Sequence, residues 1–263
     1  MDESRRRAVE SHLLTTSFPA PERERIRQRI GQRVLDEGLV DAPDFTRISQ
    51  RALSVLGEAY DRAFFGGTLG PLLDFRRGDL RYRLAPRLTR TGGKTTRLEF
   101  PKPDRHGRSA SFEIAIATQI LFQSFRDPQQ PEVVTGVRCH HRLDALQRIF
   151  EHELIHLAEM LVWYDSSCSA QRFRGIAERW FGHTESTHRL PTASDIARRT
   201  LGIRTGSRVR FEHEGEVYRG FVNRISRRAT VLVEHPQGTP YDDGRRYKKF
   251  YVPLQLLRED GRP

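Results

Sequence analysis

The sequence predicts an α+β protein: a helix-rich part with a small antiparallel sheet, followed by a small C-terminal β-barrel. Amphipathic stretches with helical spacing dominate the first 190 residues, and three short strand-like segments interrupt them. After Gly206 the apolar pattern changes to a period of two with frequent turns, which is typical of a small barrel. A length of 263 residues suits one domain with its own core plus a smaller second one.

These patterns divide the chain into four segments. We expect a charged helical arm at 1–45, a main domain at 46–190, a linker at 191–205 and the barrel at 206–258. The helices expected before the barrel are Glu22–Glu37, Phe45–Phe65, Thr118–Phe125, Leu143–Trp163, Ala170–Phe181 and a short one near Ser194–Leu201 in the linker. The strands expected in the main domain are Leu80–Leu84, Thr95–Phe100 and Phe112–Ala117, with Gly92-Gly93 as a turn.

The composition is strongly basic, with a formal charge of +11 and a pI of about 10.3. Such an excess favours polyanionic partners such as DNA or RNA. Arginine outnumbers lysine, which a coding bias toward high GC also produces, and both explanations stay open. No apolar run is long enough to span a membrane, and the first residues lack a signal-peptide pattern, so we expect a cytoplasmic protein without a membrane partner.

The strongest chemical motif is His152-Glu153-Leu154-Ile155-His156, an HExxH sequence on the most regular predicted helix. Two histidines at i and i+4 share one face of a helix, so both imidazoles reach one Zn²⁺ ion. The glutamate between them is placed to act as general base on water. The sequence therefore predicts a zinc site with His152 and His156 as ligands and Glu153 as the catalytic residue. Two surface histidines on an ordinary helix are the alternative.

A third protein ligand is needed, and Cys168 is the first candidate because a loop can bring its thiolate back over the helix. A buried, inert cysteine is the common alternative. Glu159 lies too far along the helix axis from His152 to share an ion with it, so we expect it to orient a ligand histidine instead. His183 and His188 follow the next helix, and either could coordinate or bind the oxyanion of a tetrahedral intermediate.

The surrounding motifs resemble those of SprT-like metalloproteases, a family that includes the Spartan protease for DNA-crosslinked proteins. The segments that carry the resemblance, in order, are Ala59–Gly70 with its Phe-Gly-Gly turn, Leu88–Thr95, Phe112–Ile116 and Glu151–Leu157. The resemblance covers roughly residues 50–190 and implies a zincin-like fold, Zn²⁺ and peptidase activity on a protein substrate. One departure stands out: aligning on Phe173 places Ser169 where the family has its third zinc histidine, with Cys168 one position earlier.

The tail resembles the small barrels of Tudor and KOW type, through its Gly206–Phe211 opening and the Gly220–Ile225 pattern. Basic residues and aromatic residues alternate along it. The basic ones are Arg208, Arg210, Arg219, Arg224, Arg227, Arg228, Arg245, Arg246, Lys248 and Lys249, and the aromatic ones are Tyr218, Tyr241, Tyr247, Phe250 and Tyr251. That mixture suits phosphate contacts with base stacking, and it equally suits a core of aromatic rings inside a charged surface.

Together these observations predict a zinc-dependent metallopeptidase whose basic barrel holds nucleic acid or a nucleoprotein near the active site. A nucleic-acid-binding protein with a structural or vestigial zinc site is the first alternative, because the family's third histidine is missing. A zinc hydrolase acting on another bond is the second, because HExxH does not fix the substrate. The oligomeric state leaves no trace in the sequence.

Overall fold

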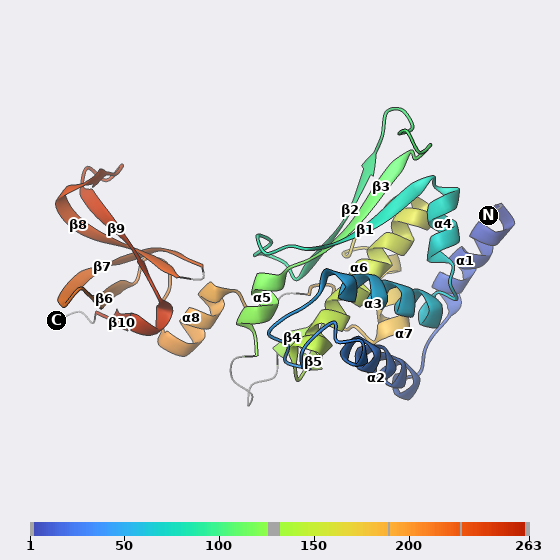
Figure 1. Ribbon diagram of the computed structural model, residues 1–263, viewed down its shortest axis with the longest axis horizontal. Helices are drawn as coiled ribbons and strands as arrows, with labels where there is room; N and C mark the ends of the chain where they lie inside the picture. Colours follow the sequence, from blue (N-terminus) through green and yellow to red (C-terminus); the bar gives the residue numbers. More distant parts are fainter. Residues whose placement is uncertain (1–2, 126–131, 189, 227, 261–263) are drawn as a thin grey trace. The chain divides into compact units, whose positions relative to one another are not determined.

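The computed structural model describes residues 3–125, 132–188, 190–226 and 228–260 (Figure 1). The chain divides into two compact units, Met1–Leu190 and Pro191–Pro263, each described here by itself. None of the described helices combines the length and the apolar composition that crossing a bilayer requires. The architecture is mixed α+β with small sheets, as expected from the sequence.

The first unit contains seven helices and five strands among its described residues. The helices are α1 (Glu3–Thr15), α2 (Ala20–Asp36), α3 (Gln50–Phe64), α4 (Leu69–Phe75), α5 (Thr118–Gln123), α6 (Arg142–Trp163) and α7 (Gln171–Phe181). The strands are β1 (Gly78–Leu84), β2 (Gly93–Glu99), β3 (Ala110–Ile116), β4 (Glu132–Val134) and β5 (Val137–Cys139). Helix α3 begins later than predicted because the Ser49 hydroxyl caps it by accepting from the Arg51 N–H.

The main sheet has the order β1-β3-β2, and it corrects the antiparallel sheet predicted from the sequence. Strand β3 pairs with β1 in parallel and with β2 in antiparallel orientation, so the sheet is mixed. Strand β3 is the most apolar and most buried of the three, which explains why it occupies the centre. Helices α3, α4 and α6 lie on the same side of this sheet in Figure 1, and α6 packs against β2 and β3.

The N-terminal residues form part of this core, which differs from the arm that we expected at 1–45. Leu13 on α1 and Val34 on α2 are fully buried in the same apolar cluster as the centre of α6. Helix α2 also inserts Arg27, whose guanidinium pairs with Glu151 of α6. Apolar residues are few in this segment and lie between many charges, so the sequence left open what its helices contact.

Helix α6 crosses the unit and is buried along almost its whole length. It begins after His141, whose side chain accepts from the Asp144 N–H, and it ends at Tyr164 in the left-handed conformation with φ of 62°. The predicted apolar stripe packs into the core. The polar residues of the helix are also buried, so each of them needs a partner or a function.

The second unit is built on a five-stranded antiparallel sheet with the order β10-β6-β7-β8-β9. Its elements are α8 (Ala193–Leu201), β6 (Arg208–His213), β7 (Glu216–Ile225), β8 (Ala229–Pro240), β9 (Arg246–Val252), the 3₁₀ turn η1 (Leu254–Leu256) and β10 (Arg258–Glu259). We expected four or five short strands forming a small barrel; the structure has five, its last strand β10 pairs with its first strand β6, and the strands enclose one apolar core. The segment expected as a linker contains α8, and Ile203 after it is buried in the core of this unit.

Candidate metal centre and active site

The two motif histidines meet on one face of α6, as the HExxH spacing predicted. The Nε2 atoms of His152 and His156 lie 3.1 Å apart, and the ring of Phe173 on α7 packs against both imidazoles. His152 is almost completely buried, and its Nδ1 atom has no hydrogen-bond partner among the described residues. Burial lowers the pKa of His152 and lowers that of His156 to about 4. Both imidazoles are therefore neutral near pH 7, and each has one nitrogen lone pair to offer.

A chain of hydrogen bonds fixes the orientation of His156. The Ser166 hydroxyl donates to the Glu159 carboxylate at 2.6 Å, and the same carboxylate accepts from Arg172 Nε at 2.6 Å. Because the single hydroxyl proton of Ser166 is used, its oxygen accepts from His156 Nδ1 at 2.7 Å. The proton of His156 therefore sits on Nδ1, and Nε2 offers its lone pair to the site. Glu159 acts through Ser166, in the orienting role that we expected for it.

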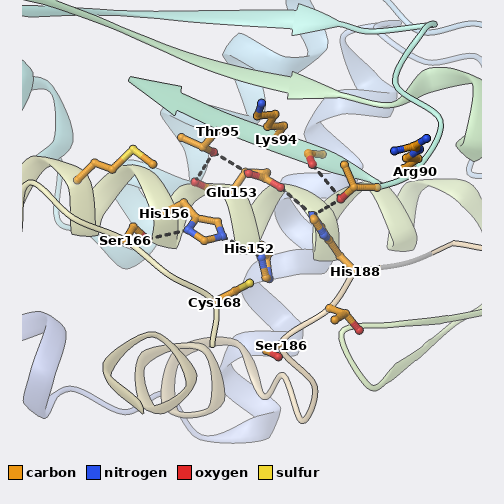
Figure 2. Close-up of a pocket in the computed structure, with 14 residues that line it drawn as sticks. Arg90, Lys94, Thr95, His152, Glu153, His156, Ser166, Cys168, Ser186 and His188 are labelled. Atoms are coloured by element: carbon orange, nitrogen blue, oxygen red, sulfur yellow. Dashed lines mark hydrogen bonds and ion pairs between the residues drawn. The ribbon is translucent and has the colours of Figure 1, made fainter. Parts of the chain in front are cut away.

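Cys168 lies in the loop between α6 and α7, and Figure 2 shows its sulfur directed toward the two histidines. One donor atom each from His152, His156 and Cys168 lies within 4.8 Å of the others. The start of the loop is anchored twice, because Arg97 of β2 donates to the Tyr164 carbonyl and Arg172 of α7 donates to the Asp165 carbonyl. The sequence placed Cys168 near the site, and these anchors explain how the loop returns it there.

Glu153 faces strand β2 across the same cavity (Figure 2). The Thr95 hydroxyl lies 2.7 Å from the Glu153 carboxylate and donates to it. The close approach of β2 depends on glycine, because a Cβ at Gly93 would lie 2.8 Å from Glu153 Oε1. We interpreted Gly92-Gly93 as a turn, but Gly93 is the first residue of β2 and makes room for the carboxylate. Burial raises the pKa of the Glu153 carboxyl to about 8, and the hydrogen bond from Thr95 opposes this shift.

His188 completes the polar wall of the cavity from a segment that follows α7. Its Nε2 lies 2.9 Å from Glu153 Oε1 and 3.2 Å from the Thr91 hydroxyl oxygen. The hairpin of β4 and β5 positions this segment, because the Thr135 N–H donates to the Thr187 carbonyl. Thr184 packs so closely on Gly136 that a Cβ there would clash with its hydroxyl. Burial, together with the neighbouring histidines, lowers the pKa of His188 to about 3.

The remaining candidates for the third ligand lie elsewhere. His183 is fully buried beside Glu151 on another face of α6, with 3.0 Å between Nε2 and the carboxylate. The Ser169 hydroxyl pairs with Ser167 at 2.9 Å, and Ser169 does not line the cavity. Of the candidates for the third metal ligand, Cys168 and His188 are therefore the two that line the cavity.

The cavity that joins these residues has a volume of about 380 Å³. It is lined on one side by α6, on another by the edge strand β2, and elsewhere by the loops that carry Cys168 and His188. Glu153 is the one carboxylate in its described lining, and the exposed side chains of Arg90 and Lys94 stand at its border (Figure 2). The cavity thus combines nitrogen and sulfur donors with one buried carboxyl group.

Sequence analysis missed Thr95, Ser166 and Thr91 as parts of this site. Thr95 follows the Gly92-Gly93 pair, and a glycine pair at the start of a strand signals close packing against another element. Ser166 lies in a loop without periodicity, so no local pattern identifies it. Comparisons of the chain with protein-family models, with curated proteins and with solved structures found no match.

Proposed function

We propose that this chain is a zinc-dependent peptidase of the SprT-like type, with His152, His156 and Cys168 as the zinc ligands and Glu153 as general base. One observation carries the proposal: three donor atoms from α6 and the following loop converge beside a buried carboxyl group at the wall of a cavity. The zincin-like arrangement of an HExxH helix beneath a small sheet with an antiparallel edge strand supports it.

The residues present fit a zinc ion. Two nitrogen ligands about 2.0–2.1 Å from a tetrahedral ion are separated by about 3.3 Å. The observed distance of 3.1 Å between the Nε2 atoms of His152 and His156 is close to this value. A thiolate is a favoured third ligand of zinc, and Cys168 supplies it. His188 is the second choice, because its Nε2 interacts with Glu153 and Thr91 and only its Nδ1, which has no hydrogen-bond partner among the described residues, is left for an ion.

A zinc ion bound there supplies a Lewis acid that polarises the substrate carbonyl and lowers the pKa of water. Glu153 takes a proton from the attacking water and later delivers it to the leaving amine. A pKa near the working pH suits both transfers, and burial raises the pKa of Glu153 in that direction. His188 holds the Glu153 carboxyl group in place through its Nε2.

A peptide is the substrate that the walls of the cavity fit best. Strand β2 is an edge strand, and its Lys94 and Thr95 line the cavity beside Glu153. An extended peptide adds to such an edge through main-chain hydrogen bonds, which would place its carbonyl groups next to the zinc ligands. This arrangement favours peptide hydrolysis over the hydrolysis of a small compact molecule.

Zinc content and casein cleavage test the proposal directly. We expect about one zinc per chain in the wild type and in Glu153→Gln, with cleavage lowered about 1,000-fold in the variant. Glu178→Gln, which changes an exposed glutamate of α7, is the matched control and should cleave as the wild type does. Zinc-loaded wild type without cleavage of casein, or equal cleavage by Glu153→Gln, would refute the peptidase assignment.

Cobalt substitution tests the role of Cys168 separately. A thiolate bound to Co²⁺ gives a charge-transfer absorption in the near ultraviolet, and we expect this band in the wild type. It should disappear in Cys168→Ser and persist in Cys139→Ser, which changes a buried cysteine that does not line the cavity. A band that survives Cys168→Ser would exclude Cys168 as a ligand.

A non-catalytic zinc site is the second candidate, and the position of His188 favours it. One donor atom each from His152, Glu153 and His188 also lies within 4.8 Å of the others. If His188 joins Cys168 on the ion, the site is closed with four protein ligands and has no position for water. Tight zinc binding that His188→Ala weakens about as much as Cys168→Ser does, without any cleavage, is the outcome that this candidate predicts.

A further inference from the structure

The sheet of the second unit has one apolar face and one basic face. Val209, Val222 and Val231 are buried on the first face, where they form a core with α8 and the segments around it. Side chains along a strand alternate between the two faces, and residues directly opposite each other on neighbouring strands share a face. The register of the sheet therefore identifies which side chains lie on the second face.

Three arginines stand in one row across this second face. Arg210 of β6 is directly opposite Arg258 of β10 on one side and Arg219 of β7 on the other. Like charges directly opposite each other destabilise a sheet. Arg219 has a partial partner in Asp260 at 3.6 Å, whereas Arg210 makes no ion pair with any residue that the structure describes. The repulsion among these three arginines would be relieved by an anion bound across the row.

More cations lie on the same face in the adjoining rows. Arg208 of β6 is opposite Phe221 of β7, and Lys249 of β9 is opposite Leu232 of β8 in the continuation of that row. A β-bulge between Val222 and Arg224 reverses the alternation at this point in β7. Without the bulge Arg224 would share the face of Val222, which is buried in the core. The bulge turns Arg224 outward, and re-aiming a side chain is a known role of bulges.

Aromatic rings accompany these cations. Tyr251 of β9 is opposite Thr230, which in turn is opposite Arg224, so the three residues form the next row. Tyr251 is 65% exposed, so its ring is accessible to a ligand on this face. Phe221 lies one row away on the same face. Phe221 is half-buried, whereas Tyr251 is an exposed ring among cations, the combination with which sheets hold unpaired bases.

We propose that this face, called here the arginine face, binds single-stranded nucleic acid. It consists of Arg208, Arg210, Arg219, Arg224, Lys249 and Arg258 together with Phe221 and Tyr251. The cations contact successive phosphates, and Tyr251 stacks on a base. The proposal uses residues of the second unit alone and does not depend on the zinc site.

The choice of a single strand follows from the exposed ring. A duplex keeps its bases stacked on one another, so its bases cannot stack on Tyr251 unless the duplex opens. An acidic protein would satisfy the cations but gives no role to the ring. Phosphates and base faces are common to DNA and RNA, so this face binds single-stranded DNA and single-stranded RNA with similar affinity.

Fluorescence anisotropy with a labelled oligothymidylate tests the cations, using the full chain at about 100 mM salt. We expect the double variant Arg208→Glu/Arg210→Glu to weaken binding at least about tenfold and to lower the salt slope by about 1.4. The double variant Arg204→Glu/Lys248→Glu has the same change in net charge at exposed positions outside the arginine face, and it should weaken binding less than threefold. Equal losses in the two variants would overturn the proposal, because net charge alone would then explain the binding.

Tyr251→Ala tests the stacking on a face whose charge is unchanged. We expect it to weaken single-strand binding about tenfold while duplex binding changes less than twofold. Oligouridylate should bind within about threefold of oligothymidylate. A Tyr251→Ala variant that binds as the wild type does, or a wild type that prefers the duplex, would overturn the proposal. Because these measurements read binding, an inactive zinc site leaves their outcome unchanged.

Discussion

Helix α6 carries two buried His–Glu arrangements on different faces, and they are built in opposite ways. On one face Glu151 accepts hydrogen bonds from Arg27 of α2 and from the Tyr60 hydroxyl at 2.8 Å, and it lies 3.0 Å from His183. We call this group the Glu151 cluster. On the other face His152, Glu153 and His156 line the cavity. The first arrangement joins four segments of the chain, while the second lines the cavity.

The difference lies in how charge is compensated. The Glu151 carboxylate is matched by the buried Arg27 guanidinium, whose pKa is raised by the nearby carboxylate against the opposing effect of burial. Around the candidate metal ligands no described arginine or lysine pairs with Glu153, and burial raises the pKa of its carboxyl group. A closed, neutralised cluster stabilises a fold, whereas uncompensated donors that converge on a cavity indicate a bound cation or a reacting group.

Breaking the Glu151 cluster should have the largest effect on stability. Glu151→Ala leaves Arg27 buried without its carboxylate, and the loss of one member of a buried ion pair costs about 3–5 kcal/mol. Urea denaturation followed by circular dichroism measures the free energy of unfolding. The exposed Glu178→Ala should change it by less than about 0.5 kcal/mol. If Glu151→Ala costs less than about 1 kcal/mol, the cluster is not the stabilising element described here.

The two arrangements also differ in how far the sequence predicts them. Spacing on a helix is local, so His152, Glu153 and His156 could be placed together from the motif alone. The partners of Glu151 come from residues 27, 60 and 183, and only the folded chain brings them together. For the same reason the helical arm predicted at 1–45 carried no expectation for the partners of Arg27. A charged residue in a polar stretch carries no local sign of burial.

The same limit applies to the sheets. Alternation located β1, β2 and β3 within a few residues, but alternation says nothing about strand order, and the parallel pairing of β1 with β3 was not foreseen. In the second unit the basic and aromatic residues were identified, while their division between two faces depends on register and on the bulge before Arg224. Arg227, which was also identified, lies outside the described residues.

Zinc should stabilise the cavity side of α6 and leave the Glu151 cluster unaffected. At a free zinc concentration about 1,000 times the dissociation constant, binding adds about 4 kcal/mol to the free energy of unfolding. We expect the melting temperature of the chelator-treated wild type to rise on adding zinc, and His156→Ala to abolish the rise. His140→Ala, which changes an exposed histidine, serves as control and should retain it. A zinc response that persists in His156→Ala would place the ion elsewhere.

The orientation of His156 by Ser166 should have a smaller effect. Removing a group that orients a ligand histidine typically costs 10- to 100-fold in metal affinity, so Ser166→Ala should weaken zinc binding by about that factor. Competition with a chelating indicator measures it. Ser167→Ala is the matched control, because Ser167 pairs with Ser169 and not with a candidate ligand. Equal affinities for the two variants would show that Glu159 and Arg172 do not act on the site through Ser166.

The smallest effect is the pH dependence of the zinc-free protein, and its sign differs on the two sides of pH 6.5. Burial lowers the pKa of His156 to about 4 and of His188 to about 3, so the unfolded chain binds more protons between these values and 6.5, and stability rises with pH in that range. Glu153 has its pKa raised to about 8 from 4.5, so its contribution is complete below pH 4.5 and is lost as pH rises toward 8.

Below pH 6.5 the two histidines together change the stability with pH more than Glu153 does in the opposite direction. Between pH 6.5 and 8, Glu153 is the group that changes it. Stability of the chelator-treated protein should therefore peak near pH 6.5 and then decline by up to about 1.4 kcal/mol per pH unit. In Glu153→Gln the decline above pH 6.5 should vanish while the rise below it remains. Urea denaturation at a series of pH values measures both limbs. If the decline persists in Glu153→Gln, another group causes it, and the Glu153 carboxyl does not have the raised pKa described here.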